Sequence, residues 1–174
     1  MQPIRIRQVK KEIRVLGVAA AGHDGLTRVV GVVFRGARWL DGVLSATSKD
    51  ADLTRMIVEM INGSPHRKQV RVMMFQAEMI PKGVKIDTIK ISSETSKPVI
   101  ILGAKGLGGV QADPNTGYFT WGKGADAVEV AYLGLRERDA EAVLRVSTRE
   151  GSTPEALRVA GLILGAIPTA QHKL

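Results

Sequence analysis

Short apolar stretches rich in valine and isoleucine follow a basic segment at the start of the chain. They occupy residues 13–19, 27–34 and 39–44. Each has the length and the β-branched content of a strand. The links between them are short and contain Gly22, Gly25 and Gly36, which favour tight turns between neighbouring strands. The pattern therefore predicts three strands joined as antiparallel hairpins.

The spacing of apolar residues then changes from that of a strand to that of a helix. Five apolar side chains share one helical face: Leu53, Met56, Ile57, Met60 and Ile61. Asp50 or Asp52 is placed to accept the first free backbone N–H groups, and Gly63 followed by Pro65 is a typical helix end. A helix is predicted between these signals.

The next segments alternate between strand and helix. Residues 70–75 have the pattern of a strand, and residues 87–94 that of a short helix. Residues 98–102 are almost entirely apolar, which is typical of a strand covered on both faces, as in a parallel pair.

Glycine dominates residues 103–124, and the chain is expected to form a long loop there. A strand is predicted for residues 127–135 and a helix for residues 137–148. The last helix is expected to start near Pro154, with Ser152 or Thr153 as its cap and Glu155 completing a capping box.

The order of these elements points to one α/β domain over residues 1–174. Three hairpin-linked strands are followed by helix, strand, helix and strand, and right-handed crossovers then give a mixed sheet flanked by helices. A ribonuclease H-like fold has this order, and it is one candidate among several mixed α/β folds. Residues 1–12 are expected to form a basic N-terminal arm.

Charge and cysteine content narrow the function classes. Lysine and arginine total 25 against 17 acids, a formal net charge of +8, which favours polyanionic partners. The chain has no cysteine, so disulfides and thiolate metal sites are excluded. The N-terminus lacks the apolar core of a signal peptide, and no apolar run approaches the roughly 20 residues of a membrane span. These features predict a cytoplasmic protein without a membrane partner.

Four short sequences together resemble an archaeal family of endonuclease V-like proteins, the domain-of-unknown-function family ninety-nine. They are Ile-Arg-Val-Leu-Gly-Val at 13–18, the Gly-Val-Val-Phe-Arg-Gly and Trp-Leu-Asp-Gly pair at 31–42, Asp-Leu-Thr at 52–54, and Thr-Pro-Glu-Ala-Leu-Arg-Val-Ala at 153–160. The resemblance extends over nearly all of residues 13–167. It implies an endonuclease V-like scaffold with a ribonuclease H-like core.

Endonuclease V cleaves nucleic acid near a deaminated base, using acids around a divalent metal. The resemblance implies one acid at the end of the first strand and one at the end of the fourth. This chain has Ala20 and Gln76 there. Neither supplies the anionic oxygen that Mg²⁺ prefers. The expected catalytic centre is therefore incomplete.

Four other acids are candidates to replace the missing carboxylates: Asp24, Asp41, Asp52 and Glu78. Asp52 is interpreted as a helix cap, and Asp24 and Asp41 as turn residues beside glycine. Glu78 lies just beyond the fourth strand, within reach of the place where an acid is missing. Asp52, Glu78 and Asp41 remain the weak catalytic candidates.

Basic residues in three segments are candidates for contact with nucleic acid: Arg5, Arg7, Lys10, Lys11 and Arg14 in the arm, Arg35, Arg38 and Trp39 at the second turn, and Arg67, Lys68 and Arg71 before the fourth strand. Cations there are suited to phosphate, and the indole is suited to stacking on a base. The resemblance implies a nucleic-acid-probing loop at the second turn. The alternative is a core tryptophan among ordinary solvated cations.

Three functions follow. The leading hypothesis is a catalytically degenerate, nucleic-acid-binding domain without a cofactor, whose most plausible partner is structured RNA or the ribosome. A second is a metal-dependent endonuclease that uses Mg²⁺ at a site rebuilt from Glu78, Asp52 and Asp41. A third is a scaffold subunit with a protein partner, whose glycine-rich loop becomes ordered on contact.

Overall fold

The computed structural model describes residues 6, 8–49, 52–103 and 114–167. The strands are β1 (Arg14–His23), β2 (Leu26–Arg35), β3 (Trp39–Ser48), β4 (Val72–Gln76), β5 (Val99–Leu102), β6 (Gly117–Trp121) and β7 (Val128–Leu133). The helices are α1 (Leu53–Asn62), α2 (Thr88–Thr95), α3 (Glu137–Ser147) and α4 (Glu155–Ala166), with short 3₁₀ turns η1 (Ala77–Met79) and η3 (Gly124–Asp126).

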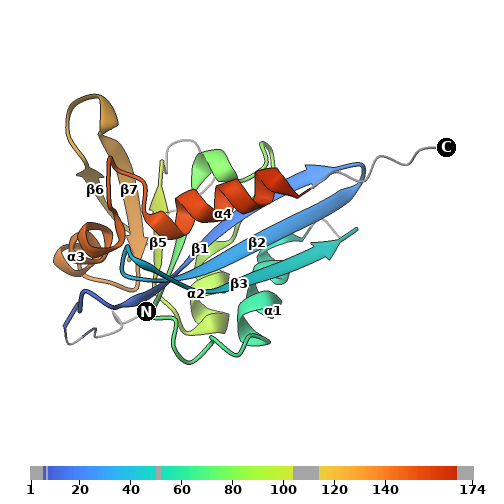
Figure 1. The fold of residues 1–174 in the computed structure, drawn as a ribbon, viewed down its shortest axis with the longest axis horizontal. Coiled ribbons are helices and arrows are strands. Elements are labelled where there is room, and N and C mark those ends of the chain that lie inside the picture. The colour runs from blue at the N-terminus through green and yellow to red at the C-terminus, as the bar shows by residue number, and fades with distance from the viewer. Residues whose placement is uncertain (1–5, 7, 50–51, 104–113, 168–174) are drawn as a thin grey trace.

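All seven strands form one mixed sheet in the order β3-β2-β1-β4-β5-β7-β6. The first three strands pair as antiparallel hairpins, while β1, β4 and β5 run parallel to one another (Figure 1). This is the mixed α/β architecture that the element order predicted, and the parallel pairing of residues 98–102 is confirmed. β1 and β3 extend beyond their predicted ends, to His23 and Ser48.

Helices cover both faces of the sheet and create two hydrophobic cores. One core joins α1 and α2 to one face, and the other joins α3 and α4 to the opposite face. In Figure 1, α4 crosses the front of β1 and β2, and α1 and α2 lie behind the sheet. The strands β4 and β5 are buried on both faces, which explains their unbroken apolar sequences.

Gly17 in the middle of β1 allows α4 to lie directly on the sheet. A Cβ atom at this position would be 2.5 Å from the carbonyl oxygen of Ala156 and 2.6 Å from the backbone nitrogen of Leu157. Backbone atoms of a packed helix have no side-chain rotamer with which to relieve such a clash. The glycine at position 17 and the start of α4 therefore depend on each other.

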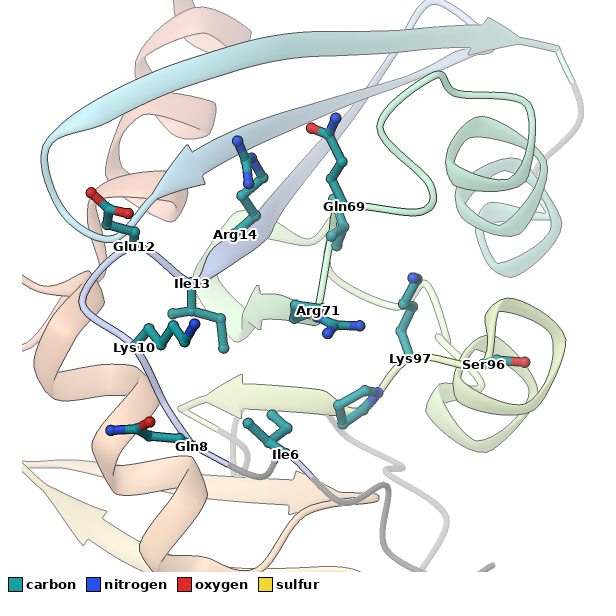
Figure 2. Close-up of a pocket in the computed structure, with 12 residues that line it drawn as sticks. Ile6, Gln8, Lys10, Glu12, Ile13, Arg14, Gln69, Arg71, Ser96 and Lys97 are labelled. Atoms are coloured by element: carbon teal, nitrogen blue, oxygen red, sulfur yellow. The ribbon is translucent and has the colours of Figure 1, made fainter.

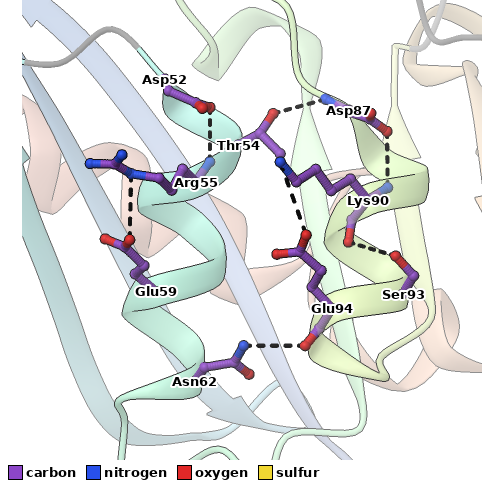
Figure 3. A network of polar contacts seen from close by, with 9 residues as sticks. All are labelled: Asp52, Thr54, Arg55, Glu59, Asn62, Asp87, Lys90, Ser93 and Glu94. Atoms are coloured by element: carbon purple, nitrogen blue, oxygen red, sulfur yellow. Dashed lines mark hydrogen bonds and ion pairs between the residues drawn. The ribbon is translucent and has the colours of Figure 1, made fainter.

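A polar network joins the two helices on the opposite face (Figure 3). The Asp52 carboxylate accepts the backbone N–H of Arg55 at 3.0 Å, so its predicted role as the cap of α1 is confirmed. Thr54 Oγ1 accepts the backbone N–H of Asp87 at 3.0 Å, and Asp87 caps α2 through the N–H of Lys90. Both helices thus begin side by side.

The predicted loop at residues 103–124 is wrong in its last part. Residues 117–121 form β6, an edge strand that pairs antiparallel with β7. Gly117 leaves room there for the ring of Tyr132 on the neighbouring strand, which a Cβ at position 117 would displace. The density of glycine hid the strand pattern, since a glycine that makes room for an aromatic ring reads in a sequence like a loop glycine.

The predicted capping box of α4 is also wrong. Pro154 occupies the cap position and makes no side-chain hydrogen bond, and Glu155 pairs with Arg158 at 2.7 Å instead. The carbonyl of Ser152 accepts the indole N–H of Trp121 at 3.1 Å. A contact with β6 therefore holds this segment in place of a local cap.

Within the part of the chain that the structure describes, no helix combines the length and apolar character needed to cross a lipid bilayer.

Candidate nucleic-acid interface

The candidate residues lie at two opposite sides of the sheet, one formed by the amino ends and the other by the carboxyl ends of the parallel strands. We call each of these sides an edge, as distinct from the outer, or edge, strands β3 and β6. β1, β4 and β5 all start at one edge and end at the other. We call the edge where they end the carboxyl edge; it carries Ala20, Gln76 and Glu78. We call the edge where they start the basic edge. It contains Lys10, Lys11, Arg14, Arg35, Arg38, Trp39, Arg67, Lys68, Arg71 and Lys97.

The described residues at the carboxyl edge do not form a divalent-metal site. Ala20 is 5% exposed and belongs to the core between the sheet and α1. Gln76 donates a hydrogen bond to Glu78 at 3.3 Å, and its buried Oε1 has no partner among the described residues. No group of three or more histidine or acidic side chains in the described ranges is arranged to hold a metal ion. Mg²⁺ prefers carboxylate oxygen, and neither Ala20 nor Gln76 supplies a carboxylate.

Asp41 is not the turn residue that its position before Gly42 suggested. It lies within β3, where its carboxylate accepts hydrogen bonds from Arg14 at 2.7 Å and from Arg35 at 2.9 Å. Burial raises the pKa of Asp41, but the two guanidinium groups outweigh it and hold the pKa below its usual value. Since Arg14 starts β1, Asp41 lies at the basic edge, away from Glu78. Asp41, Asp52 and Glu78 therefore do not form one site.

Asp24 occupies the tight turn between β1 and β2, as predicted. Its φ of +50° is followed by φ +73° at Gly25. The carboxylate is exposed and lies 3.0 Å from Nε2 of His23. Asp24 therefore lies at the far tip of the first hairpin, at the opposite end of β1 from Arg14.

The basic edge brings together cations that are far apart in the sequence. The backbone N–H of Arg71 bonds to the carbonyl of Arg14 at 2.9 Å, and Arg14 is the register partner of Arg35. The backbone of Lys11 lies against Gly36 in the second turn. The N-terminal arm, the turn between β2 and β3 and the loop before β4 therefore meet at the basic edge. The candidates Arg5 and Arg7 lie outside the described residues.

Trp39 is on the surface and not in the core. The residue is 59% exposed, and the next residue, Leu40, is 52% exposed. β3 is an edge strand, and α4 packs mainly on β1 and β2. The alternative of a core tryptophan is therefore wrong, and a large aromatic face lies beside the cations of the second turn.

A pocket of about 700 Å³ opens at this edge, between the arm and the starts of β4 and β5 (Figure 2). Its charged lining is Lys10, Glu12, Arg14, Arg71 and Lys97. Lys97 was missed at the sequence level because it lies alone between α2 and β5. Burial, and then the charges of Arg71 and Arg67, lower its pKa. The only sequence signal was its position just before a buried strand.

This sheet order, with helices on both faces, is the ribonuclease H-like architecture of endonuclease V. The chain is similar to the catalytic domain of human endonuclease V, with a TM-score of 0.62, 10% identity and coverage of 93% of this chain and 86% of that one. A protein of unknown function from Archaeoglobus fulgidus aligns with a TM-score of 0.66 and 19% identity over 88% of this chain and 96% of that one. These likenesses define the fold.

The chain belongs to the family described as Endonuclease dU, whose model matches residues 11–108, more than half of the sequence. It is 31% identical to a UPF0215 protein of Methanothermobacter thermautotrophicus, over 99% of this chain and 96% of that protein. A UPF0215 protein of Methanopyrus kandleri is 41% identical over 56% of this chain and 52% of its own length. The predicted resemblance to an archaeal endonuclease V-like family is confirmed. The designation of that family as domain-of-unknown-function family ninety-nine stays a prediction.

Proposed function

We propose that this protein is a nucleic-acid-binding member of its family that has lost the metal-dependent cleavage centre, and that it binds through the basic edge. The observation that carries the proposal is the convergence of separate basic segments on one edge of the sheet. Such a concentration of positive charge attracts phosphate and raises the rate of encounter with a polyanion.

The distance between the two edges supports binding without cleavage. Arg14 and Ala20 are six residues apart on the same strand, which corresponds to about 20 Å at roughly 3.3 Å per residue. A duplex that follows the basic edge would therefore run well away from the carboxyl edge. The acids needed for metal-assisted hydrolysis are also replaced there by Ala20 and Gln76.

Structured RNA, alone or in the ribosome, is the partner that we favour. Aromatic residues make up only 4% of the chain, and Trp39 is the aromatic side chain among the candidates at the basic edge. Proteins that bind single strands without sequence preference use several stacking side chains, whereas helical RNA is recognised through shape, phosphate and 2′-hydroxyl contacts. Cations with one aromatic side chain fit the second mode better.

A matched pair of charge reversals tests the binding surface. Lys68→Glu at the basic edge is compared with Lys85→Glu, an exposed lysine in the segment between η1 and α2 at the other edge. Both variants change the net charge equally. We expect the first to weaken binding to a labelled RNA hairpin several-fold in fluorescence anisotropy and the second to leave it nearly unchanged. Equal losses would mean that net charge alone acts, and the basic edge would then not be the site.

Salt dependence and co-sedimentation test the partner. Affinity should fall linearly with the logarithm of the salt concentration, because each phosphate contact releases counterions. In native lysate, the protein should sediment with ribosomes or RNA, and ribonuclease should release it. An affinity that does not change with salt would contradict the proposal.

Cleavage is the second candidate function, and the family description favours it. Its test is incubation of deoxyuridine- and deoxyinosine-containing strands with Mg²⁺ or Mn²⁺. We expect no product from this protein. Metal-dependent cleavage that Glu78→Gln abolishes would establish the rebuilt centre and overturn the proposed loss of activity.

A further inference from the structure

The pocket at the basic edge has the size of a small-ligand site. Its volume of about 700 Å³ lies within the range of roughly 300–1,000 Å³ that is usual for such sites. The side chains of Ile6 and Ile13 line it beside the cations (Figure 2). A ligand with both a charged group and an apolar face would match this lining.

The charges in the pocket are unbalanced. Its lining contains four cations, Lys10, Arg14, Arg71 and Lys97, and one acid, Glu12. Asp41 neutralises Arg14, but no ion pair within the described ranges involves Lys10, Arg71 or Lys97. Cations that are held together without a counterion repel one another, and a bound anion removes that cost.

Hydrogen bonds fix the backbone that carries three of these cations, Arg14, Arg71 and Lys97. Lys97 is fixed on both sides of its peptide: its N–H bonds to the carbonyl of Ser92 at 3.3 Å, and its carbonyl accepts the hydroxyl of Ser92 at 2.7 Å. Ser96 before it adopts a left-handed φ of +56°, which is uncommon for a residue other than glycine. The segment of Arg71 is bonded to that of Arg14 on one side. The backbone positions from which Arg71 and Lys97 project into the pocket lining are therefore fixed.

We propose that this pocket holds the terminal phosphate monoester of a nucleotide, at the end of a strand bound along the basic edge. The inference rests on the proposed function. A terminal monoester carries a charge of about −1.5 to −2 at neutral pH, whereas an internal phosphodiester carries a single charge. A cluster of unpaired cations therefore favours the strand end over the strand interior, and the pocket also has room for the attached nucleoside.

The test uses one internally labelled RNA in three forms: with hydroxyls at both ends, with a 5′-phosphate and with a 3′-phosphate. We expect the intact protein to bind one phosphorylated form about tenfold more tightly than the hydroxyl form, as charge-assisted hydrogen bonds provide. Lys97→Met should abolish this preference while keeping the apolar part of the side chain. Lys68→Met, a basic-edge residue outside the pocket, should weaken all three forms by the same factor.

Each alternative result has a distinct meaning. Equal binding of the three forms, or a preference that survives in Lys97→Met, would overturn the pocket assignment and leave the proposed function standing. If no RNA binds, calorimetry with adenosine monophosphate decides. Binding that Lys97→Met abolishes would identify a free nucleotide as the source of the phosphate, and the proposed function would fail alone. Absence of both would overturn both proposals. A thermal melt confirms that each variant is folded.

Discussion

Replacing Asp41 with asparagine should lower stability and raise nucleic-acid affinity at the same time. The carboxylate lies between Arg14 and Arg35, with N–O distances of 2.7 and 2.9 Å, and its side chain is 13% exposed. Asparagine has nearly the same shape and keeps one acceptor oxygen. It loses the negative charge and the second acceptor, so one guanidinium is left without its hydrogen bond.

The loss of stability is moderate, because both arginines are partly exposed. A hydrogen bond to a charged group contributes about 1.5–3 kcal/mol when it is well buried. The side chains of Arg14 and Arg35 are 33% and 36% exposed, and solvent weakens such pairs. We therefore expect a free energy of unfolding lower by about 1–2 kcal/mol, and a melting temperature lower by roughly 2–8 °C for a chain of this size.

The pH dependence should change in the same variant. The folded pKa of Asp41 is below its unfolded value, so its stabilising effect is complete above the unfolded pKa of about 4. That effect is lost as the pH falls through the lower folded value. In asparagine this contribution is absent at every pH, so the stability difference between the two proteins should shrink in acid.

The expected effect on affinity has the opposite sign. Removing one acid changes the formal net charge from +8 to +9, and it releases Arg14 and Arg35 from their shared partner. An extra cation that reaches a phosphate steepens the logarithmic salt slope by up to about 0.9. Fluorescence anisotropy with an RNA hairpin, at a series of potassium chloride concentrations, should show tighter binding and this steeper slope.

Asp24→Asn is the matched control. It makes the same charge change at the far tip of the hairpin, and asparagine tolerates the left-handed φ of this position. Neither stability nor affinity should change appreciably. Two results would refute the reasoning. One is weaker RNA binding by Asp41→Asn at a temperature well below the melting temperature of that variant, where it is folded. The other is an equal gain in affinity for Asp41→Asn and Asp24→Asn.

Three further substitutions separate structural from functional roles. Gly17→Ala should lower the free energy of unfolding by about 3 kcal/mol or more in chemical denaturation, because the added carbon meets the backbone of Ala156. A smaller loss would mean that α4 shifts easily. Trp39→Ala should change stability by less than about 0.5 kcal/mol and weaken RNA binding by roughly 1–3 kcal/mol in anisotropy; unchanged affinity would rule out stacking. Glu78→Gln should leave RNA affinity unchanged, since Glu78 lies at the other edge, and a clear loss would place the partner there.

Several features that depend on interactions over a few residues were predicted correctly, although the capping box of α4 was not. The apolar stripe of α1, its cap at Asp52 and the turn at Asp24 all involve groups within one helical turn or one tight turn. The order of strands and helices indicated a mixed α/β fold, because short hairpins and right-handed crossovers limit the topologies, and the family resemblance then singled out the ribonuclease H-like fold among the candidates. The resemblance to the family, and not the residues alone, directed attention to Ala20 and Gln76 as places where an acid was expected.

Features that depend on contacts between distant segments required the tertiary structure. Asp41 has the local sequence of a turn residue, but the pairing of β2 with β3 places it at a β-bulge within the strand, beside Arg14 and Arg35. Lys97 carries no motif, and it becomes part of a pocket because β1, β4 and β5 all start at the same edge. Electrostatic interactions depend on distance in space, and strand pairing alone converts basic residues scattered along the chain into one charged edge.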